Sequence, residues 1–315
     1  MSLSDRLHSL DRRQQQSRRL GFIAAVVKKF EEDGAGQLAA LISYYAFVSL
    51  FPLLLVFVTI LGFILQGNPS EQKKILDGTL GQIPLISDQI ERHSISGSTP
   101  ALVIGIVLSL LAGLGITSAT QHALNRIWNV PFKDRPDFLR SRLRGLAMLA
   151  ILGTLAIVSA VAAGFVGSVG HPAIAVVGGV VVAFTFNIAL FMIAFKLLTA
   201  AEVAWRDLLP GVLVASVLWQ LLEHIGGYYI DHVLKRTEPL YGVFAIVLGL
   251  LAWLYLGAQL VIFSAEINVV RLYRLWPRSF FAGPLLDADK RALTGSAEVE
   301  ERIEEEHVEV EFDGP

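Results

Sequence analysis

Six long apolar segments constrain the fold of this chain more than any other feature of its sequence. Each is about as long as the roughly 20 residues that an α-helix needs to cross about 30 Å of hydrocarbon. The segments are Leu38–Leu65, Ala101–Leu124, Gly145–Val169, Ala173–Leu198, Leu208–Ile230 and Gly242–Ile267. Backbone groups in lipid must bond within their own segment, and the period-two alternation of a membrane β-strand is absent. The sequence therefore predicts an all-α polytopic membrane protein with six transmembrane helices.

The composition excludes the main alternatives to a membrane protein. Hydrophobic residues make up 54% of the chain and charged residues only 17%, whereas soluble domains contain about 25% charged residues. The chain has no Cys, so it can form neither a disulfide nor a thiolate metal site. A water-soluble globule and a disulfide scaffold are therefore both excluded.

The distribution of Lys and Arg predicts how the chain is oriented in the membrane. The N-terminal tail, the loops after the second and fourth segments, and the C-terminal tail together hold 21 of the 26 such residues. Positively charged loops stay in the cytoplasm. We therefore expect both termini on the cytoplasmic side of a multi-pass protein.

The chain divides into a transmembrane domain, residues 38–284, and two cytoplasmic tails. In the N-terminal tail, residues 1–37, apolar residues recur at helical spacing among Arg and Lys, at Leu20, Ile23, Val26, Val27 and Phe30. This pattern indicates an amphipathic helix that lies on the anionic inner leaflet, packs under the bundle, or does both. The C-terminal tail, residues 285–315, carries 11 acidic and three basic residues, so we expect it to be disordered.

Three stretches of the sequence resemble a known family. They are LISYYAFVSLFPLLLVF from Leu41, HALNRIWNV from His122, and the region from WRDLLPGVLVASVLWQ to YGVFAIVLGLLAWLYLGAQLVIFSAEINVV, which ends at Val270. Together they resemble the YihY/virulence factor BrkB family of six-helix bacterial inner-membrane proteins, over roughly residues 20–275. The chain departs from the family pattern at Val243, where a small residue is usual, and at Ser264, where Gly is usual. The resemblance implies a location in the bacterial plasma (inner) membrane and a role in envelope integrity.

The sequence carries no motif for catalysis, although the family was once labelled ribonuclease BN. The seven His residues are scattered, and neither a His-Glu-x-x-His helix nor a carboxylate cluster offers a metal site. The phosphate-binding Gly-x-x-x-x-Gly-Lys loop and the Gly-x-Ser-x-Gly nucleophile motif are also absent. We therefore expect no enzymatic activity, no cofactor and no metal.

Polar residues near the predicted inner ends of the segments form the main candidate site. They are Tyr44, Tyr45, His122, Asn125, Arg126, Lys196, Gln259 and Glu266. Arg can donate two hydrogen bonds to a phosphate, so these residues predict a cytoplasm-facing cavity for an anionic headgroup. Alternatively, Arg126 and Lys196 reach the lipid headgroups without forming a site. For Glu266 the alternative is an ion pair that clamps the sixth segment to the second.

Other polar and small residues within the segments are candidates for further roles. Glu223 and His224 lie side by side in the fifth segment and could relay protons, or they could form hydrogen bonds between helices. Pro52 predicts a kink in the first segment. Gly164 and Gly167 predict a close-packing face on the third segment.

Two functions remain open from the sequence. The first is a transporter or flippase of an anionic lipid or amphiphile that supports envelope integrity. The alternative is a non-transporting membrane scaffold that binds partners through its tails. Membrane lipids are the expected partners, a homo-oligomer and a protein that binds the acidic tail are further candidates, and we expect no nucleic acid partner.

Overall fold

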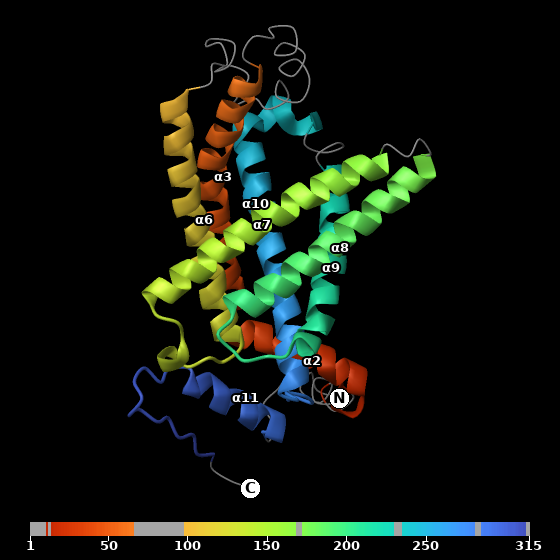
Figure 1. Ribbon diagram of the computed structural model, residues 1–315. Helices are drawn as coiled ribbons and strands as arrows, with labels where there is room; N and C mark the ends of the chain where they lie inside the picture. The colour runs from red at the N-terminus through yellow and green to blue at the C-terminus, as the bar shows by residue number, and fades with distance from the viewer. Residues whose placement is uncertain are drawn as a thin grey trace. The chain divides into compact units, whose positions relative to one another are not determined.

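The fold is known from a computed structural model that describes residues 11, 14–65, 98–167, 172–229, 235–280 and 285–312. In this part of the chain every regular element is a helix (Figure 1). Six helices are long and apolar enough to cross a membrane, which confirms the predicted fold class. They are α3 (Ala35–Leu65), α6 (Thr99–Ile127), α7 (Phe138–Gly167), α8 (Pro172–Leu198), α9 (Trp205–Tyr229) and α10 (Lys235–Leu272). Shorter elements are α2 (Arg18–Glu32), the 3-10 turn η2 (Phe132–Asp134) and α11 (Asp287–Glu298).

Several helices extend beyond the apolar segments that predict them. The third segment was expected from Gly145, but α7 begins at Phe138. The Asp137 carboxylate accepts a hydrogen bond of 2.8 Å from the Arg140 backbone N–H, as an N-cap residue does. A capped helix needs no apolar side chains in its first turns, so α7 can begin before the apolar run that predicts it.

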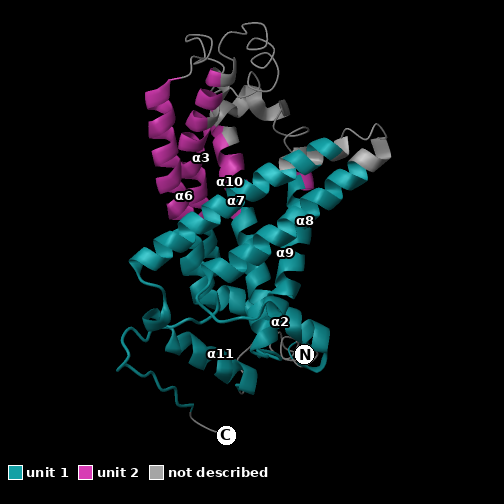
Figure 2. Ribbon diagram, viewed as in Figure 1, with its two compact units in different colours: residues 1–41, 117–223, 256–315 teal, residues 42–116, 224–255 magenta. Residues whose placement is uncertain are grey.

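The chain forms two compact units (Figure 2). Unit 1 consists of residues 1–41, 117–223 and 256–315, and unit 2 consists of residues 42–116 and 224–255. Unit 1 therefore contains α2, α7, α8 and α11 complete, together with most of α9 and the C-terminal parts of α6 and α10. Unit 2 contains most of α3 and the N-terminal parts of α6 and α10.

In unit 2, glycines allow α6 to pack closely against α3. A Cβ atom at Gly105 would lie 2.9 Å from Cγ2 of Val56, and one at Gly115 would lie 2.6 Å from Cδ1 of Tyr45. Small residues at such contacts let the side chains of the neighbouring helix approach the backbone. Helix α3 continues through Pro52, and the kink expected there stays a prediction.

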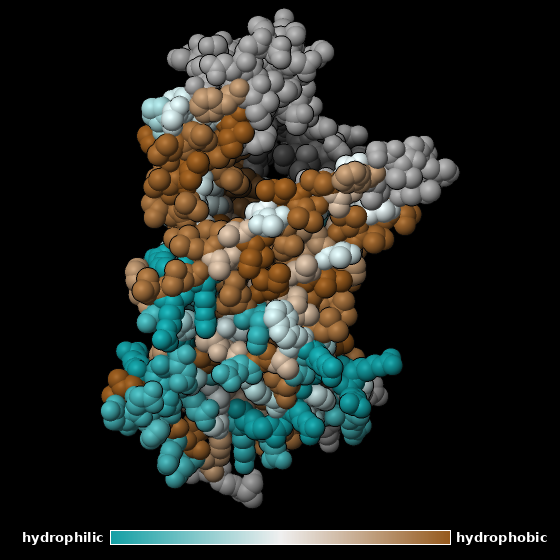
Figure 3. Space-filling model, viewed as in Figure 1, coloured by the Kyte–Doolittle hydropathy of each residue, from teal (hydrophilic) through white to brown (hydrophobic). Residues whose placement is uncertain are grey.

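In unit 1, α7 and α8 lie along each other (Figure 1), and many of their apolar side chains are exposed. Ile157, Phe165 and Val176 are 68%, 72% and 68% exposed. In the view of Figure 3, hydrophobic residues cover these two helices. Outer surfaces of this kind are suited to lipid and not to water.

The close-packing face predicted on α7 at Gly164 stays a prediction. A Cβ atom added there would meet no other atom within 4 Å in the described residues. The neighbouring Phe165 and Val161 are exposed as well, so this part of α7 faces away from the core of unit 1. Gly167 is the last residue of α7, and its packing role stays a prediction.

In unit 1, a glycine allows α9 and α10 to pack closely against each other. A Cβ atom at Gly211 would lie 2.2 Å from the Ser264 carbonyl oxygen. The Asn268 side-chain amide accepts a hydrogen bond of 2.7 Å from the Gly211 N–H and donates one of 3.0 Å to the Leu208 carbonyl. These bonds flank Pro210, which has no N–H to donate. Asn268 thus binds backbone groups of α9 on both sides of the proline and joins α9 to α10.

Polar residues of unit 1 concentrate in one region, termed the terminal layer: α2, residues 273–280 and residues 285–312 (Figure 3). Arg278 is 1% exposed and lies at its centre. Its guanidinium donates two hydrogen bonds to Glu32, of 2.8 and 3.0 Å, and one of 2.9 Å to Asp289. Asp289 therefore links the start of α11 to the N-terminal helix.

The disorder expected for residues 285–315 does not hold for the described residues 285–312. Val299 accepts a backbone hydrogen bond from Phe132, and Glu301 accepts one from Lys133. The Lys133 ammonium also lies 2.9 Å from the Glu301 carboxylate. The expectation was based on net charge alone. It failed because several acids of this segment pair with bases elsewhere in unit 1, so the charges that predicted disorder hold the segment in place.

Candidate functional site

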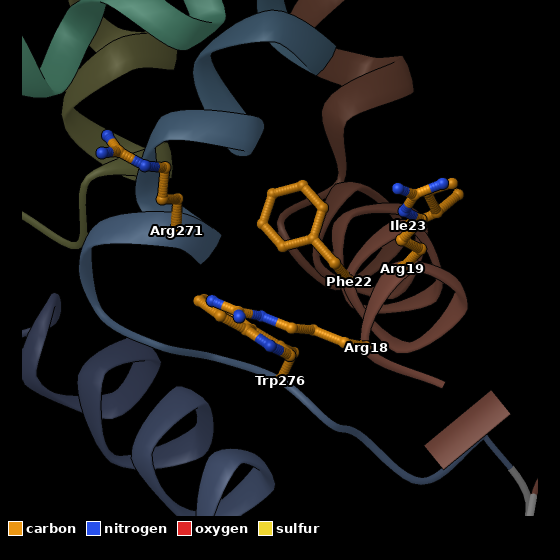
Figure 4. Close-up of a pocket in the computed structure, with 6 residues that line it drawn as sticks. All are labelled: Arg18, Arg19, Phe22, Ile23, Arg271 and Trp276. Carbon is orange, nitrogen blue, oxygen red and sulfur yellow. The ribbon is translucent and has the colours of Figure 1, made fainter. Parts of the chain in front are cut away.

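A pocket lined by three arginines lies where α2 meets the end of α10. It has a volume of about 700 Å³ and is lined by Arg18, Arg19, Phe22, Ile23, Arg271 and Trp276 (Figure 4). The rings of Phe22 and Trp276 pack edge to face, with centroids 5.3 Å apart. The site, termed the arginine pocket, therefore combines cationic and aromatic groups from two separate parts of the sequence.

Local sequence explains how α2 positions its share of the pocket. The Ser17 hydroxyl caps the helix by accepting a bond from the Leu20 N–H. Gly21, Ala25 and Val26 form the buried face, whereas Leu20 and Ile23 are 55% and 56% exposed. The helix therefore packs on one side and presents apolar side chains beside the arginines on the other. Its contact with a lipid interface stays a prediction.

The described residues that line the pocket include three arginines and no acidic residue. Asp207 of α9 lies nearest to Arg271, with 4.0 Å between carboxylate oxygen and guanidinium nitrogen, and both side chains are largely exposed. An exposed pair at this distance provides little neutralisation. Three guanidinium groups beside aromatic rings can bind an anionic group that carries an apolar portion.

A second polar site, which includes Lys29 and Glu266, is buried between α2 and α10. The Lys29 ammonium lies 2.5 Å from a carboxylate oxygen of Asp33 and 3.7 Å from one of Glu266, and it donates a 3.1 Å bond to the Ile127 carbonyl. The three side chains are 3%, 4% and 0% exposed. This arrangement, termed the buried cluster, joins α2 to α10 and to the last residue of α6.

The electrostatics of Lys29 are those of a buried group held by carboxylates. Burial by itself acts to lower the pKa of its ammonium group, but Glu266 and Asp33 outweigh burial and raise the pKa above its ordinary value. Lys29 therefore remains charged. The sequence left open whether the N-terminal helix lies on the leaflet or packs under the bundle, and the Lys29 side chain is buried.

The residues of the predicted inner layer are divided between the two units. Tyr44 and Tyr45 belong to unit 2, where their rings pack against each other with centroids 5.5 Å apart. His122 is exposed on α6. The Asn125 side chain accepts a bond of 2.7 Å from the Ala200 N–H, and so connects the end of α6 to the loop after α8.

The predicted cations also have individual partners. Lys196 donates a bond of 2.7 Å to the Val203 carbonyl. Arg126 lies 3.1 Å from Glu300 of the C-terminal segment. Arg126 and Glu266 therefore do not share a partner: Arg126 lies beside Glu300, and a carboxyl oxygen of Glu266 lies 3.7 Å from the Lys29 ammonium of α2. Gln259 is half-buried on α10.

The proton relay predicted at Glu223 and His224 stays a prediction. Its carboxylate is exposed and accepts a bond of 2.8 Å from the indole N–H of Trp219, one helical turn away. His224 is exposed and belongs to unit 2. A relay needs a chain of donors and acceptors, and the contact found for Glu223 lies along its own helix.

Sequence reasoning found Glu266 but missed both its partner and the arginine pocket. The available signal was the pairing of Arg18 and Arg19 with apolar residues in one amphipathic segment, together with Arg271 at the end of the sixth segment. What the sequence could not provide was the proximity of these two segments, which are more than 240 residues apart.

The fold and these sites define a polytopic α-helical membrane protein with a polar layer built from both ends of the chain. The sequence profile of the family described as Virulence factor BrkB matches residues 26–279. The chain belongs to this family, as the resemblance of its motifs predicted.

Relatives with curated names are membrane proteins. The UPF0761 membrane protein of Alcanivorax borkumensis is 26% identical over 259 residues, which cover 78% of this chain and 59% of the relative. The UPF0761 membrane protein of Pseudoalteromonas atlantica is 25% identical over 263 residues, which cover 79% of this chain and 85% of the relative. Inner membrane protein YhjD of Escherichia coli is 23% identical over 283 residues, which cover 82% of this chain and 83% of the relative. This chain thus spans less than two thirds of the first of these relatives. No solved structure matches the chain.

Proposed function

We propose that this protein binds an anionic amphiphile by its headgroup and moves it across the bacterial inner membrane, as a transporter or flippase that supports envelope integrity. The arginine pocket carries the proposal. It places three guanidinium groups and two aromatic rings around one cavity on α2 and the end of α10. The pocket replaces the inner layer of polar residues as the headgroup site.

The chemistry of the pocket favours an amphiphile over a small soluble anion. A guanidinium group can hold a phosphate through two parallel hydrogen bonds. Trp and Phe rings are suited to the boundary between headgroups and acyl chains. The exposed apolar side chains of Leu20 and Ile23 continue this surface next to the arginines. An anionic lipid fits both halves of the surface at once.

Headgroup binding is tested with the detergent-purified protein. Native mass spectrometry would compare retention of phosphatidylglycerol with retention of phosphatidylcholine. We expect the wild type to prefer the anionic lipid. The double variant that combines Arg18→Gln and Arg271→Gln should lose this preference. Arg140→Gln is the matched control, because it removes one charge from an exposed side chain whose neighbour is Asp137 at 3.9 Å. Equal retention of both lipids by the wild type would refute the site.

Movement across the membrane is tested separately in proteoliposomes. Vesicles containing fluorescent phosphatidylglycerol are treated with dithionite, which bleaches only the label in the outer leaflet. We expect the wild type to expose inner-leaflet label to bleaching, and Arg271→Gln to slow this exposure. Vesicles that bleach no further than protein-free vesicles would remove transport and leave lipid binding alone.

The alternative, a non-transporting scaffold, is favoured by one observation. The C-terminal segment presents exposed acids at Glu304, Glu305, Glu309 and Glu311. Changing these four to Gln leaves Asp289, Glu300 and Glu301 with their partners inside the chain. A scaffold predicts that this variant fails to restore envelope integrity in a deletion strain. A transporter predicts full restoration.

A further inference from the structure

The buried cluster contains two carboxyl groups and one ammonium group. Lys29, Asp33 and Glu266 are all more than nine-tenths buried. If all three were ionised, the cluster would hold a net charge of about −1 away from water, and an uncompensated buried charge is strongly unfavourable. The single lysine can neutralise only one of the two carboxylates. The other carboxyl group therefore needs a further positive charge.

The hydrogen bonds of the cluster show which carboxyl group is left over. Lys29 donates to Asp33 at 2.5 Å and to the Ile127 carbonyl at 3.1 Å. Its distance to Glu266 is 3.7 Å, which is longer than a hydrogen bond. Neither carboxyl oxygen of Glu266 accepts a hydrogen bond from any residue that the structure describes. An ionised carboxylate is an acceptor at both oxygens, so burial without donors disfavours that form.

We propose that the buried cluster is a binding site for one proton, which is carried by Glu266. In the occupied state Glu266 is a neutral carboxylic acid, while Lys29 and Asp33 form a charged pair. The cluster then has no net charge. Release of the proton to water leaves an ionised Glu266, and rebinding restores the neutral acid, so no other reactant is required.

A proton suits this cluster better than a metal cation does. The ammonium group of Lys29 already lies within 4 Å of both carboxyl groups, and a second fixed cation would be repelled at that distance. No group of three or more His, Cys, Asp or Glu side chains suited to a metal occurs among the described residues.

The other charged and titratable groups around the cluster do not compete for this proton. Glu32 of α2 is engaged by the guanidinium of Arg278. At the end of α6 the neighbouring group is the carbonyl of Ile127. Burial raises the pKa of the Tyr273 phenol, with Lys29 opposing it, so the phenol stays neutral near neutral pH. Glu266 is therefore the group whose charge changes.

The proton site and the arginine pocket are built on the same two helices. Helix α2 supplies Arg18 and Arg19 to the pocket and Lys29 to the cluster, and α10 supplies Arg271 and Glu266. Loss of the proton adds a negative charge between these helices and weakens their attachment. A proton is thus the coupling ion that the structure offers for transport. This link rests on the proposed function, whereas proton binding itself does not.

Infrared spectroscopy of the full-length protein in detergent tests proton binding without any lipid assay. A protonated carboxyl group gives a carbonyl stretching band separate from that of a carboxylate. We expect the wild type to show this band near neutral pH and to lose it at alkaline pH. Glu266→Gln should lack the band. Arg126→Gln, which changes a charge at the end of α6 outside the cluster, should keep it.

A second variant, Asp33→Asn, tests the charge count independently. It keeps the proposal testable if Glu266→Gln fails to fold. In Asp33→Asn the lysine has only one carboxyl partner, so we expect Glu266 to ionise and the band to disappear. Thermal stability should fall at alkaline pH in the wild type and become independent of pH over that range in Glu266→Gln.

Three results would overturn the proton site. They are absence of the band in the wild type, a band unchanged in Glu266→Gln, and wild-type stability that responds to replacing sodium by choline but not to pH. If the band behaves as expected but proteoliposomes show no lipid movement, the proton site stands and the transport proposal fails.

Discussion

Two buried ion clusters hold the same helix α2, and they differ in how completely their charges are satisfied. Asp289 accepts hydrogen bonds from Lys28 at 2.8 Å, Arg278 at 2.9 Å, and the backbone N–H groups of Ser279 at 3.0 Å and Leu286 at 3.2 Å. Glu266, equally buried, accepts none from the described residues. Full burial therefore does not distinguish the two carboxyl groups, but the number of donors does.

The difference separates a structural role from one that can change with conditions. A carboxylate with four donors is stable in its ionised form and fixes the elements that supply those donors. A buried carboxyl group without donors is stable only when it takes up a proton or a counter-ion. The first cluster secures the C-terminal segment, and the second leaves one group free to titrate.

The largest effect is expected when the cluster around Asp289 loses its central cation, Arg278. Arg278→Met leaves Glu32 and Asp289 without their shared partner, and breaking a buried pair costs about 3–5 kcal/mol. We expect chemical unfolding in detergent to show this loss and residues 287–312 to become sensitive to protease. Intact protection of that segment would show that Asp289 does not hold it.

Removal of the lysine tests the second cluster. Lys29→Met leaves Asp33 buried without its cation, and we expect a loss of unfolding free energy of about 3 kcal/mol. Adding Asp33→Asn should restore much of this loss, because the double variant buries no charge at that point. If the double variant is as unstable as Lys29→Met, the loss comes from packing and not from charge.

Acid should release the C-terminal segment through Asp289. Burial would raise the pKa of this carboxyl, but hydrogen bonds from Lys28, the Ser279 N–H and Arg278 outweigh it and hold the pKa below its ordinary value. The stabilisation is therefore complete above the unfolded pKa of about 3.9 and is lost as the pH falls through the folded pKa. Energy transfer between dyes on α2 and α11 would decrease in that range, and Asp289→Asn should weaken the high-efficiency signal already at neutral pH.

The smallest effect is expected for an exposed pair. The side chains of Arg126 and Glu300 are 29% and 53% exposed, and such pairs contribute less than about 1 kcal/mol. Arg126→Gln should therefore leave the unfolding midpoint close to that of the wild type. A loss as large as that of Lys29→Met would mean that Arg126 belongs to a buried cluster after all.

The sequence predicts the membrane helices because hydrocarbon imposes one simple rule on every apolar segment. Each of the six was found from length and lack of charge alone, and only the capped and polar extensions, such as the start of α7 at Phe138, escaped. The site was harder, because charge patterns do not specify partners. Arg126 and Glu266 were both identified as candidates from the sequence. Arg126 lies beside Glu300 and Glu266 lies beside Lys29, and both neighbours come from the tails. No local sequence pattern shows that these tail residues lie next to the transmembrane helices.

The ties between α2 and the last part of the chain also set an order of assembly. Glu32 and Arg278 are 246 residues apart, and Lys28 and Asp289 are 261 apart. During translation α2 leaves the ribosome long before either partner is made. The N-terminal helix therefore reaches the membrane before Arg278 and Asp289, which bind Glu32 and Lys28, are made. The arginine pocket and the proton site both need residues at or near the end of α10, so a product that terminates before this part of the chain would be inserted without either.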